Sequence, residues 1–153
     1  MIDFYYAPTP NGWKVAIMLE ELELEYTTHL MRLGDGDQFK SAFMAISPNA
    51  KMPAIIDHDP PKSYGTNSVS VFESGAIMLY LADKFKQFIP TDPLGRKEAM
   101  EWMFWQVGNQ GPMAGQLSHF VNYAPNDQQD YGRKPYGGEK GRNQAGLGKP
   151  ARK

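Results

Sequence analysis

The sequence predicts an α/β domain that is followed by the first helix or helices of an all-α domain. Three observations predict this fold class. Over residues 1–88, short runs with the alternating pattern of strands are interspersed with runs of helical period. Residues 89–95 carry two prolines and interrupt both patterns, as a linker does. Over residues 96–125 the apolar residues recur with a helical period alone.

Composition narrows the class of protein. The chain has 153 residues, 41% of them hydrophobic, and a formal net charge of −1, which gives no case for a nucleic-acid or membrane partner. No apolar run approaches the roughly 20 residues of a membrane span, and the N-terminus has no signal-peptide pattern. The absence of cysteine excludes disulfides and any catalytic thiol of the chain's own. Three histidines without metal-pair spacing predict no metal site, and a cytoplasmic protein is expected.

The first three elements are expected to form a strand–helix–strand unit. A strand is predicted over residues 2–6, a helix from near Trp13 to Leu22, and a second strand over residues 24–30. A helix of this length can carry the chain across the sheet, so the two strands are predicted to be parallel.

The next elements complete the domain. A short helix is expected over residues 38–46, a strand over 54–57 and a strand over 69–72, with the two strands joined as a hairpin by a long loop. A mostly apolar helix is predicted to start at Ser74. The resulting order, βαβ-α-ββα, is that of a thioredoxin-like domain, and we expect it to end near residue 88.

The remainder divides at residue 125. A long helix is predicted from Arg96, with a kink or interruption at Pro112. Residues 126–153 contain six glycines and two prolines, with seven Lys or Arg against three Asp or Glu. Such a segment buries too little to offset its ordering entropy, so a poorly ordered basic tail is expected.

The stretch over residues 7–12, Ala-Pro-Thr-Pro-Asn-Gly, joins the first strand to the first helix. Its prolines stop the strand, and Asn11 is predicted to cap the helix, with Gly12 adding backbone freedom. One interpretation is a plain corner. The other is a site for a thiolate or carboxylate, held by the helix N-terminus and the side chains of Thr9 and Asn11.

Two further stretches carry the same kind of ambiguity. Pro53 lies just ahead of a buried strand; base rates favour a trans bond, whereas a cis bond would expose the backbone of Met52 to an extended peptide-like ligand. Ser74 is an N-cap by its position in the sequence. Alternatively, a ligand carboxylate binds Ser74 and the helix N-terminus while Glu73 pairs with an adjacent ammonium group.

Taken together, these stretches resemble the glutathione S-transferase family. Ser-Pro-Asn-Ala-Lys-Met-Pro-Ala-Ile (47–55), Phe-Glu-Ser-Gly-Ala-Ile (72–77) and Tyr-Leu-Ala (80–82) resemble its N-terminal domain. Three further stretches resemble the nu-class branch of this family: residues 7–12, Trp-Met-Phe-Trp-Gln-Val-Gly (102–108) and Gly-Pro-Met (111–113). Proteins of that branch are similar to both transferases and disulfide-bond reductases. The resemblance covers residues 1 to about 125 and only the start of the family's C-terminal helical domain.

The resemblance implies a glutathione site. The implied binding residues are Gln38, Lys51, Met52, Pro53, Glu73 and Ser74. The Met52–Pro53 bond is then cis and faces the cysteinyl part, Glu73 and Ser74 hold the γ-glutamyl end, and Lys51 and Gln38 lie near the glycyl and neighbouring polar groups.

The resemblance also implies that Thr9 and Asn11 face the glutathione sulfur. Hydrogen-bond donors there stabilise the thiolate over a thiol whose free pKa is about 8.5. The thiolate then attacks an electrophilic carbon or a disulfide. Because the chain has no cysteine, disulfide exchange has to proceed through glutathione itself.

Two functions follow from the sequence. The first is a glutathione-dependent transferase or disulfide-bond reductase, with glutathione as co-substrate and no metal. The second is a truncated non-catalytic paralogue that acts as a glutathione-binding or protein-interaction module. An apolar surface on residues 96–121 predicts a homodimer or larger assembly with these residues at the contact, or else a marginally stable chain that is prone to aggregate. Four residues there either border a pocket for the second substrate or pack in a core: Phe104, Trp105, Met113 and Phe120.

Overall fold

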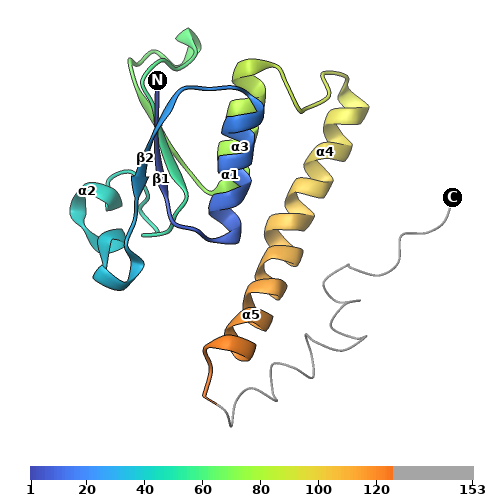
Figure 1. Ribbon diagram of the computed structural model, residues 1–153. Helices are drawn as coiled ribbons and strands as arrows, with labels where there is room; N and C mark the ends of the chain where they lie inside the picture. Colours follow the sequence, from blue (N-terminus) through green and yellow to red (C-terminus); the bar gives the residue numbers. More distant parts are fainter. Residues whose placement is uncertain (126–153) are drawn as a thin grey trace, which may run out of the picture. The chain divides into compact units, whose positions relative to one another are not determined.

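The computed structural model describes residues 1–125, which belong to two compact units. The two units are described separately. The first unit is Met1–Gly95, and the second starts at Arg96. The first unit holds a sheet with helices on its faces, and the second is helical (Figure 1). This confirms the predicted fold class. The expectation for residues 126–153 lies outside the described part of the chain.

The first unit is built on a four-stranded sheet with the order β2-β1-β3-β4. The strands are β1 (Ile2–Tyr6), β2 (Tyr26–Leu30), β3 (Ala54–Asp57) and β4 (Val69–Phe72). β1 and β2 are parallel, whereas β3 is antiparallel to both β1 and β4. The predicted parallel pair and the predicted hairpin are therefore both present.

The second strand begins two residues later than predicted because helix α1 (Pro10–Glu21) uses the backbone of residues 23 and 24 to end. The N–H of Leu24 donates to Leu19 O (3.1 Å), and the N–H of Glu23 donates to Glu20 O (2.9 Å). Glu23 adopts a left-handed conformation with φ 52°. This is the Schellman ending of a helix, so Leu24 cannot join the sheet.

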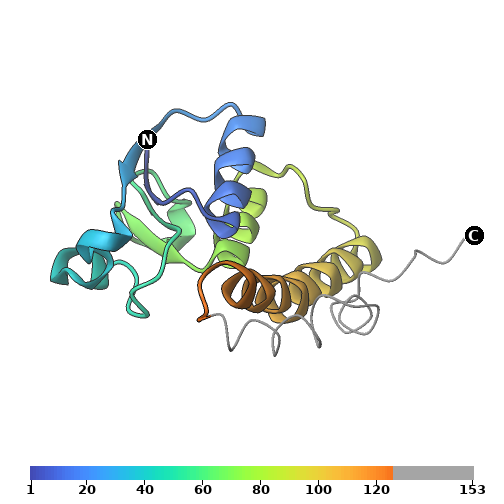
Figure 2. The same cartoon turned by 60° about the horizontal axis from the view of Figure 1, so that its bottom comes forward.

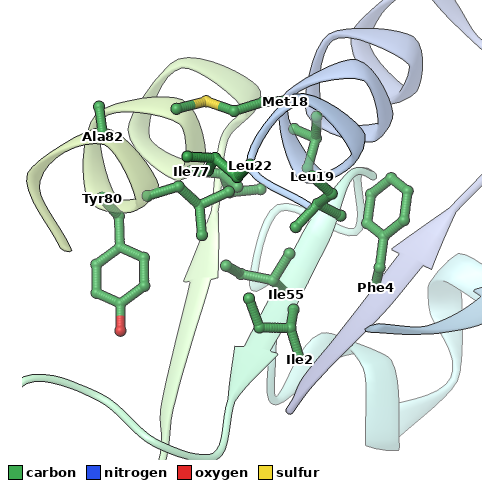
Figure 3. Close-up of a cluster of buried hydrophobic side chains, with 11 residues drawn as sticks. Ile2, Phe4, Met18, Leu19, Leu22, Ile55, Ile77, Tyr80 and Ala82 are labelled. Atoms are coloured by element: carbon green, nitrogen blue, oxygen red, sulfur yellow. The ribbon is translucent and has the colours of Figure 1, made fainter. Parts of the chain in front are cut away.

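Helices α1 and α3 (Ser74–Phe85) lie side by side over one face of the sheet, as both views show (Figures 1 and 2). Their apolar stripes face the side chains of β1 and β3 (Figure 3). The fully buried residues of this core include Phe4, Val15, Leu19, Ile55, Ile77 and Leu81. Each large side chain buried this way contributes about 1.5–3 kcal/mol, so this core is what holds the two helices to the sheet.

The opposite face of the sheet is covered by short elements. They are the 3₁₀ turns η1 (Leu33–Asp35) and η2 (Asp37–Phe39) and the four-residue helix α2 (Ser41–Met44). The helix predicted over 38–46 is thus split into two short pieces, because Lys40 has extended backbone (ψ 137°) between them. A smaller apolar cluster of Met31, Phe43 and Ala54 lies under this face.

A buried ion pair links β3 to the end of α3. Asp57 is fully buried and accepts hydrogen bonds from Lys84 Nζ (2.6 Å), Tyr80 Oη (2.6 Å) and the Asp59 N–H (2.9 Å). Burial alone would raise the pKa of Asp57, but these hydrogen bonds and the Lys84 charge hold it below its usual value. Burial and the bond to Asp57 raise the pKa of Tyr80. The charged form of Asp57 therefore stabilises the fold.

The described part of the second unit is a helical stretch with one irregular turn. It contains α4 (Pro93–Trp105) from Arg96 onward, a π-helical turn η4 (Gln106–Gln110) and α5 (Gly111–Asn122). The helix starts three residues before the predicted Arg96, because Asp92 Oδ1 accepts from the Gly95 N–H (2.8 Å) as an N-cap does. The predicted interruption at Pro112 is present as the π turn just ahead of this residue. Because proline has no backbone N–H, one hydrogen bond of the regular helix is missing, and the π turn accommodates that gap. Within residues 1–125, no helix is both long and apolar enough to span a membrane.

Candidate functional site

Three chain segments meet at one edge of the sheet. In the strand register, Tyr5 pairs with Ala54, and Ala54 pairs with Phe72. The ends of β1 and β4 therefore lie beside the start of β3. Each of the three stretches that the sequence singles out is adjacent to one of these strand ends, so the topology brings them together.

The first segment is the corner between β1 and α1. The capping residue is Thr9, which has extended backbone (φ −120°, ψ 157°) and whose Oγ1 accepts from the Gly12 N–H (3.3 Å). The prediction that Asn11 caps the helix is wrong. Pro10 fits the first helical position because it lacks a donor and has the right φ, so the helix starts there and Asn11 lies inside its first turn.

Gly12 has a packing role that the sequence did not reveal. A Cβ at this position would lie 2.5 Å from Ala7 O and 2.8 Å from the ring of Tyr6. Glycine thus allows the start of α1 to approach the end of β1 closely, and the backbone freedom expected for it is not what the position requires. The close approach fixes where Thr9 and Asn11 lie.

The second segment is residues 47–53. The Met52–Pro53 bond is cis, as the resemblance implied. Ser47 is fully buried, and its Oγ lies 2.7 Å from both Asn49 Oδ1 and Lys51 O. Ala50 has a left-handed backbone with φ 54°. The segment is therefore a hydrogen-bonded turn that leads directly into β3.

The third segment is the corner between β4 and α3. Glu73 has φ 70° and ψ 120°, so it is the residue that precedes the helix, and Ser74 is the first helical residue. The prediction that Ser74 is the N-cap is wrong for this reason, and no side-chain capping bond is made by Glu73 either. Ser74 is only 6% exposed, and within residues 1–125 its hydroxyl has no hydrogen-bond partner.

Residues from all three segments line one pocket. Its volume is about 50 Å³, room for roughly four water molecules. The lining residues are Asn11, Lys51, Met52, Pro53, Glu73 and Ser74. All six are among the residues predicted for the site. Thr9 is not a lining residue; it caps α1, the helix whose first turn contributes Asn11 to the lining.

The pocket carries charges of both signs. Lys51 and Glu73 are exposed, whereas Ser74 is buried at the start of α3. Lys14 of α1 is half-buried and interacts electrostatically with Glu73. Burial lowers the pKa of Lys14, and the Glu73 charge opposes that change. Free N–H groups of the first turn of α3 add donors beside the Ser74 hydroxyl. The arrangement suits a ligand with a carboxylate and an ammonium group side by side.

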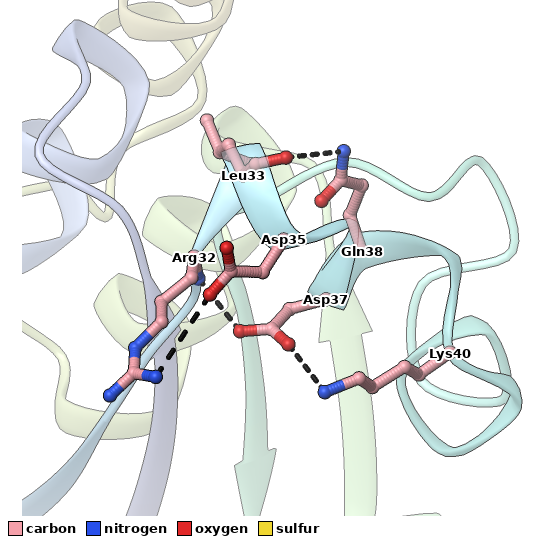
Figure 4. A network of polar contacts seen from close by, with 6 residues as sticks. All are labelled: Arg32, Leu33, Asp35, Asp37, Gln38 and Lys40. Atoms are coloured by element: carbon pink, nitrogen blue, oxygen red, sulfur yellow. Dashed lines mark hydrogen bonds and ion pairs between the residues drawn. The ribbon is translucent and has the colours of Figure 1, made fainter.

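Gln38 is placed apart from the pocket lining. It lies in η2 within a polar network of residues 32–40, drawn in Figure 4, where its Nε2 donates to Leu33 O (3.4 Å). Its Oε1 is buried and has no hydrogen-bond partner within the described chain. In the same network, hydrogen bonds from Lys40 and the Arg32 N–H hold the pKa of Asp37 below its usual value. Contact of Gln38 with a ligand stays a prediction.

The sequence reasoning missed two residues that support the pocket. Asn49 Nδ2 donates to Glu73 Oε1 (2.8 Å), and Lys14 lies near the same carboxylate. Asn49 belongs to the stretch 47–55 that carries the resemblance, but nothing in the local sequence relates it to Glu73. The helical period of α1 gives no sign that Lys14 lies near Glu73. Within residues 1–125, no cluster of His, Asp or Glu is arranged to hold a metal ion.

Comparison with known proteins finds one matching family model and several similar chains. Residues 2–83, more than half of the chain, match the family "Glutathione S-transferase, N-terminal domain". Among curated proteins, the disulfide-bond oxidoreductase YfcG of Escherichia coli is 51% identical over 125 residues, covering 82% of this chain and 57% of that protein. The disulfide-bond oxidoreductase YghU of the same organism is 47% identical over 132 residues, covering 81% of this chain and 43% of that protein. The chain thus spans about half the length of these relatives.

Among solved structures, the chain is similar to glutathione transferases. A glutathione transferase from Burkholderia graminis, with two glutathione molecules bound per subunit, superposes with a TM-score of 0.84 at 42% identity. The match covers 95% of this chain and 60% of that one. A glutathione transferase from Pseudomonas putida, with one glutathione disulfide bound per subunit, has a TM-score of 0.82 at 36% identity. That match covers 95% of this chain and 62% of the other.

Proposed function

The chain belongs to the glutathione S-transferase family, and on that premise we propose that it binds glutathione in the sheet-edge pocket and activates it as a thiolate. The bound thiolate attacks a disulfide or an electrophilic carbon. The observation that carries this proposal is the convergence of Asn11, Lys51, Met52, Pro53, Glu73 and Ser74 on one pocket.

The γ-glutamyl end of glutathione suits the corner at α3. Its α-carboxylate accepts from the Ser74 hydroxyl and from the free N–H groups of the first helical turn. Its ammonium group, one carbon away, pairs with the Glu73 carboxylate. The Ser74 hydroxyl has no partner inside the described chain, so ligand binding does not require an internal hydrogen bond to break.

The sulfur of glutathione suits the corner at α1. The Oγ1 of Thr9 accepts from the Gly12 N–H, which leaves the hydroxyl proton free to donate to the sulfur. The Asn11 amide adds a second donor in the first turn of the helix, whose positive end also favours an anion. These groups stabilise thiolate over thiol and so lower the pKa of the bound cysteinyl group.

Reduction of one disulfide consumes two molecules of glutathione in two exchange steps. The first thiolate attacks one sulfur of the disulfide, forms a mixed disulfide and releases the other sulfur as a thiolate. A second glutathione thiolate attacks the glutathione sulfur of the mixed disulfide, yields glutathione disulfide and releases the remaining thiol. This chain supplies no cysteine to either step.

A second function is favoured by the helical unit. None of the residues of α4, η4 or α5 is buried, so the described part of this unit has no core of its own. A non-catalytic role, as a glutathione-binding or protein-interaction module, is consistent with such an uncovered surface.

One experiment separates the two functions. Calorimetric titration with glutathione measures binding, and turnover is then measured with hydroxyethyl disulfide and with an activated aryl chloride. We expect binding together with turnover of at least one substrate. Binding without turnover of either would favour the module, and no binding would overturn the proposal.

A further inference from the structure

We propose that Asn49 is a positioning residue, which holds the Glu73 carboxylate where it meets the ammonium group of the ligand. This inference rests on the proposed function, because the ligand in question is glutathione. Asn49 itself does not line the pocket. It acts through one hydrogen bond, from Asn49 Nδ2 to Glu73 Oε1 (2.8 Å), which joins the turn before β3 to the corner before α3.

The orientation of the Asn49 amide follows from its other contacts. Its Oδ1 accepts from the Lys51 N–H (3.3 Å), and a backbone N–H can only donate. The amide oxygen therefore faces Lys51, and the amide nitrogen faces Glu73. The hydroxyl of the buried Ser47 lies 2.7 Å from the same oxygen, which further limits rotation of the amide. The donor that meets Glu73 is thus fixed in direction.

Both segments joined by this bond have costly backbone conformations. Ala50, directly after Asn49, has φ 54°, and Glu73 has φ 70°. Residues with a Cβ adopt the left-handed region only where surrounding contacts require it, and such residues gather at ligand sites. The amide of Asn49 is hydrogen-bonded to both turns, to the Lys51 N–H in one and to the Glu73 carboxylate in the other. These hydrogen bonds supply the contacts that such conformations need.

Glu73 needs a fixed partner because it is exposed and has a cation nearby. Its side chain can rotate in solvent, and Lys14 of α1 interacts with its charge. Lys51, another cation, lines the same pocket. The bond from Asn49 occupies one lone pair of Oε1, and a carboxylate has about four such positions. The rest of the carboxylate stays open to the pocket and to a ligand ammonium group.

A purely structural role for Asn49 makes a different prediction. The bond from the Lys51 N–H to Asn49 Oδ1 is an Asx turn, which asparagine and aspartate form equally well. If the turn were the whole role of Asn49, Asn49→Asp would bind glutathione as the unchanged chain does. If Asn49 positions Glu73, the same variant replaces a donor with a second carboxylate 2.8 Å from the first.

The sign of the pH effect in Asn49→Asp follows from charge. Two carboxylates at this separation raise each other's affinity for a proton. At low pH one shared proton gives the pair the same net charge, −1, that the Asn49–Glu73 pair carries as built. At higher pH both groups ionise, repulsion moves Glu73, and binding weakens. The defect should therefore be present at high pH and disappear as pH falls.

The test is calorimetric titration with S-methylglutathione, whose blocked sulfur does not titrate. For Asn49→Asp we expect binding at about pH 8 to be at least about tenfold weaker than for the unchanged chain. The difference should largely close by about pH 5, where the carboxylate pair shares a proton. Asn67→Asp, which adds the same charge in the loop before β4 and outside the pocket, should leave the profile unchanged.

A double-mutant cycle gives an independent readout. If Asn49 acts through Glu73, Asn49→Ala should weaken binding in the unchanged chain and have little further effect in Glu73→Ala. Additive losses, or an Asn49→Asp profile parallel to that of the unchanged chain, would overturn the inference and leave the proposed function standing. Failure of the unchanged chain to bind S-methylglutathione or glutathione would overturn both.

Discussion

Replacement of Ser74 by alanine separates ligand binding from fold stability at this site. The Ser74 side chain lines the pocket, is 6% exposed and makes no hydrogen bond within residues 1–125. Because Glu73, not Ser74, precedes the helix, the substitution removes no capping bond. Alanine also has the best intrinsic helix propensity, so the first turn of α3 should form as before.

The expected sizes of the two effects differ clearly. A hydrogen bond from a hydroxyl to a ligand carboxylate is worth about 1.5–3 kcal/mol, which corresponds to roughly 10- to 150-fold in the dissociation constant. The free energy of unfolding should change by less than about 0.5 kcal/mol, since no internal contact of the hydroxyl is lost. If Ser74 were the cap, unfolding would instead become easier by about 1 kcal/mol.

Calorimetric titration with glutathione measures the first effect, and urea unfolding measures the second. Ser70→Ala is the matched control, because Ser70 is an exposed serine of β4 that does not line the pocket. Neither quantity should change in the control. Unchanged glutathione affinity in Ser74→Ala would refute the assignment of the carboxylate site. A loss of about 1 kcal/mol in the free energy of unfolding would refute the conclusion that Ser74 is not the N-cap of α3.

Four further measurements test the cap of α1, the activation of the sulfur, the buried ion pair and the assembly state. Thr9→Ala should lower the free energy of unfolding by about 1 kcal/mol through loss of the α1 cap. Thr9→Ala and Asn11→Ala should each move the pH–rate profile of the glutathione reaction to higher pH, with Thr9→Ser as the control that retains the hydroxyl; an unmoved profile would point to another activating group. Asp57→Asn should lower the free energy of unfolding by about 3 kcal/mol, because it breaks a buried ion pair. Since the folded-state pKa of Asp57 lies below its usual value, its contribution should be complete above about pH 4 and lost as pH falls further, so the variant should be less acid-sensitive than the unchanged chain. Light scattering after size-exclusion chromatography should show a dimer or larger assembly, because Trp102 and Phe104 are 60% and 63% exposed; a monomer with a sharp unfolding transition would contradict that expectation.

The sequence alone was sufficient for the order and type of the main elements. The spacing of Val15, Met18, Leu19 and Leu22 predicts one helix face, and all four residues are buried. The same holds for the alternation of Ile2 and Phe4 in β1. These patterns are local consequences of helix and strand geometry, so they can be read without knowing the partners. The three stretches of the site were found for a related reason, because Pro, Asn, Gly and Ser mark corners.

Tertiary structure decided which residue does what at each corner. The sequence permits either Thr9 or Asn11 to cap α1, and either Glu73 or Ser74 to precede α3. The choice depends on backbone angles that are set by where β1 and β4 end against β3. Gly12 is needed because a Cβ there would meet Ala7 O, a contact that exists only once α1 packs beside β1.

The link between Asn49 and Glu73 could come only from the folded chain. The two residues are 24 positions apart, and neither helical nor strand period relates them. They meet because β4 pairs with β3 in the register that sets Phe72 beside Ala54. Local sequence determined that this protein has a turn at residues 47–53, before β3, and a corner between β4 and α3. Sheet pairing decided that an amide from one of those segments hydrogen-bonds a carboxylate from another, since a hydrogen bond needs its two atoms within about 3 Å and only the register supplies that approach.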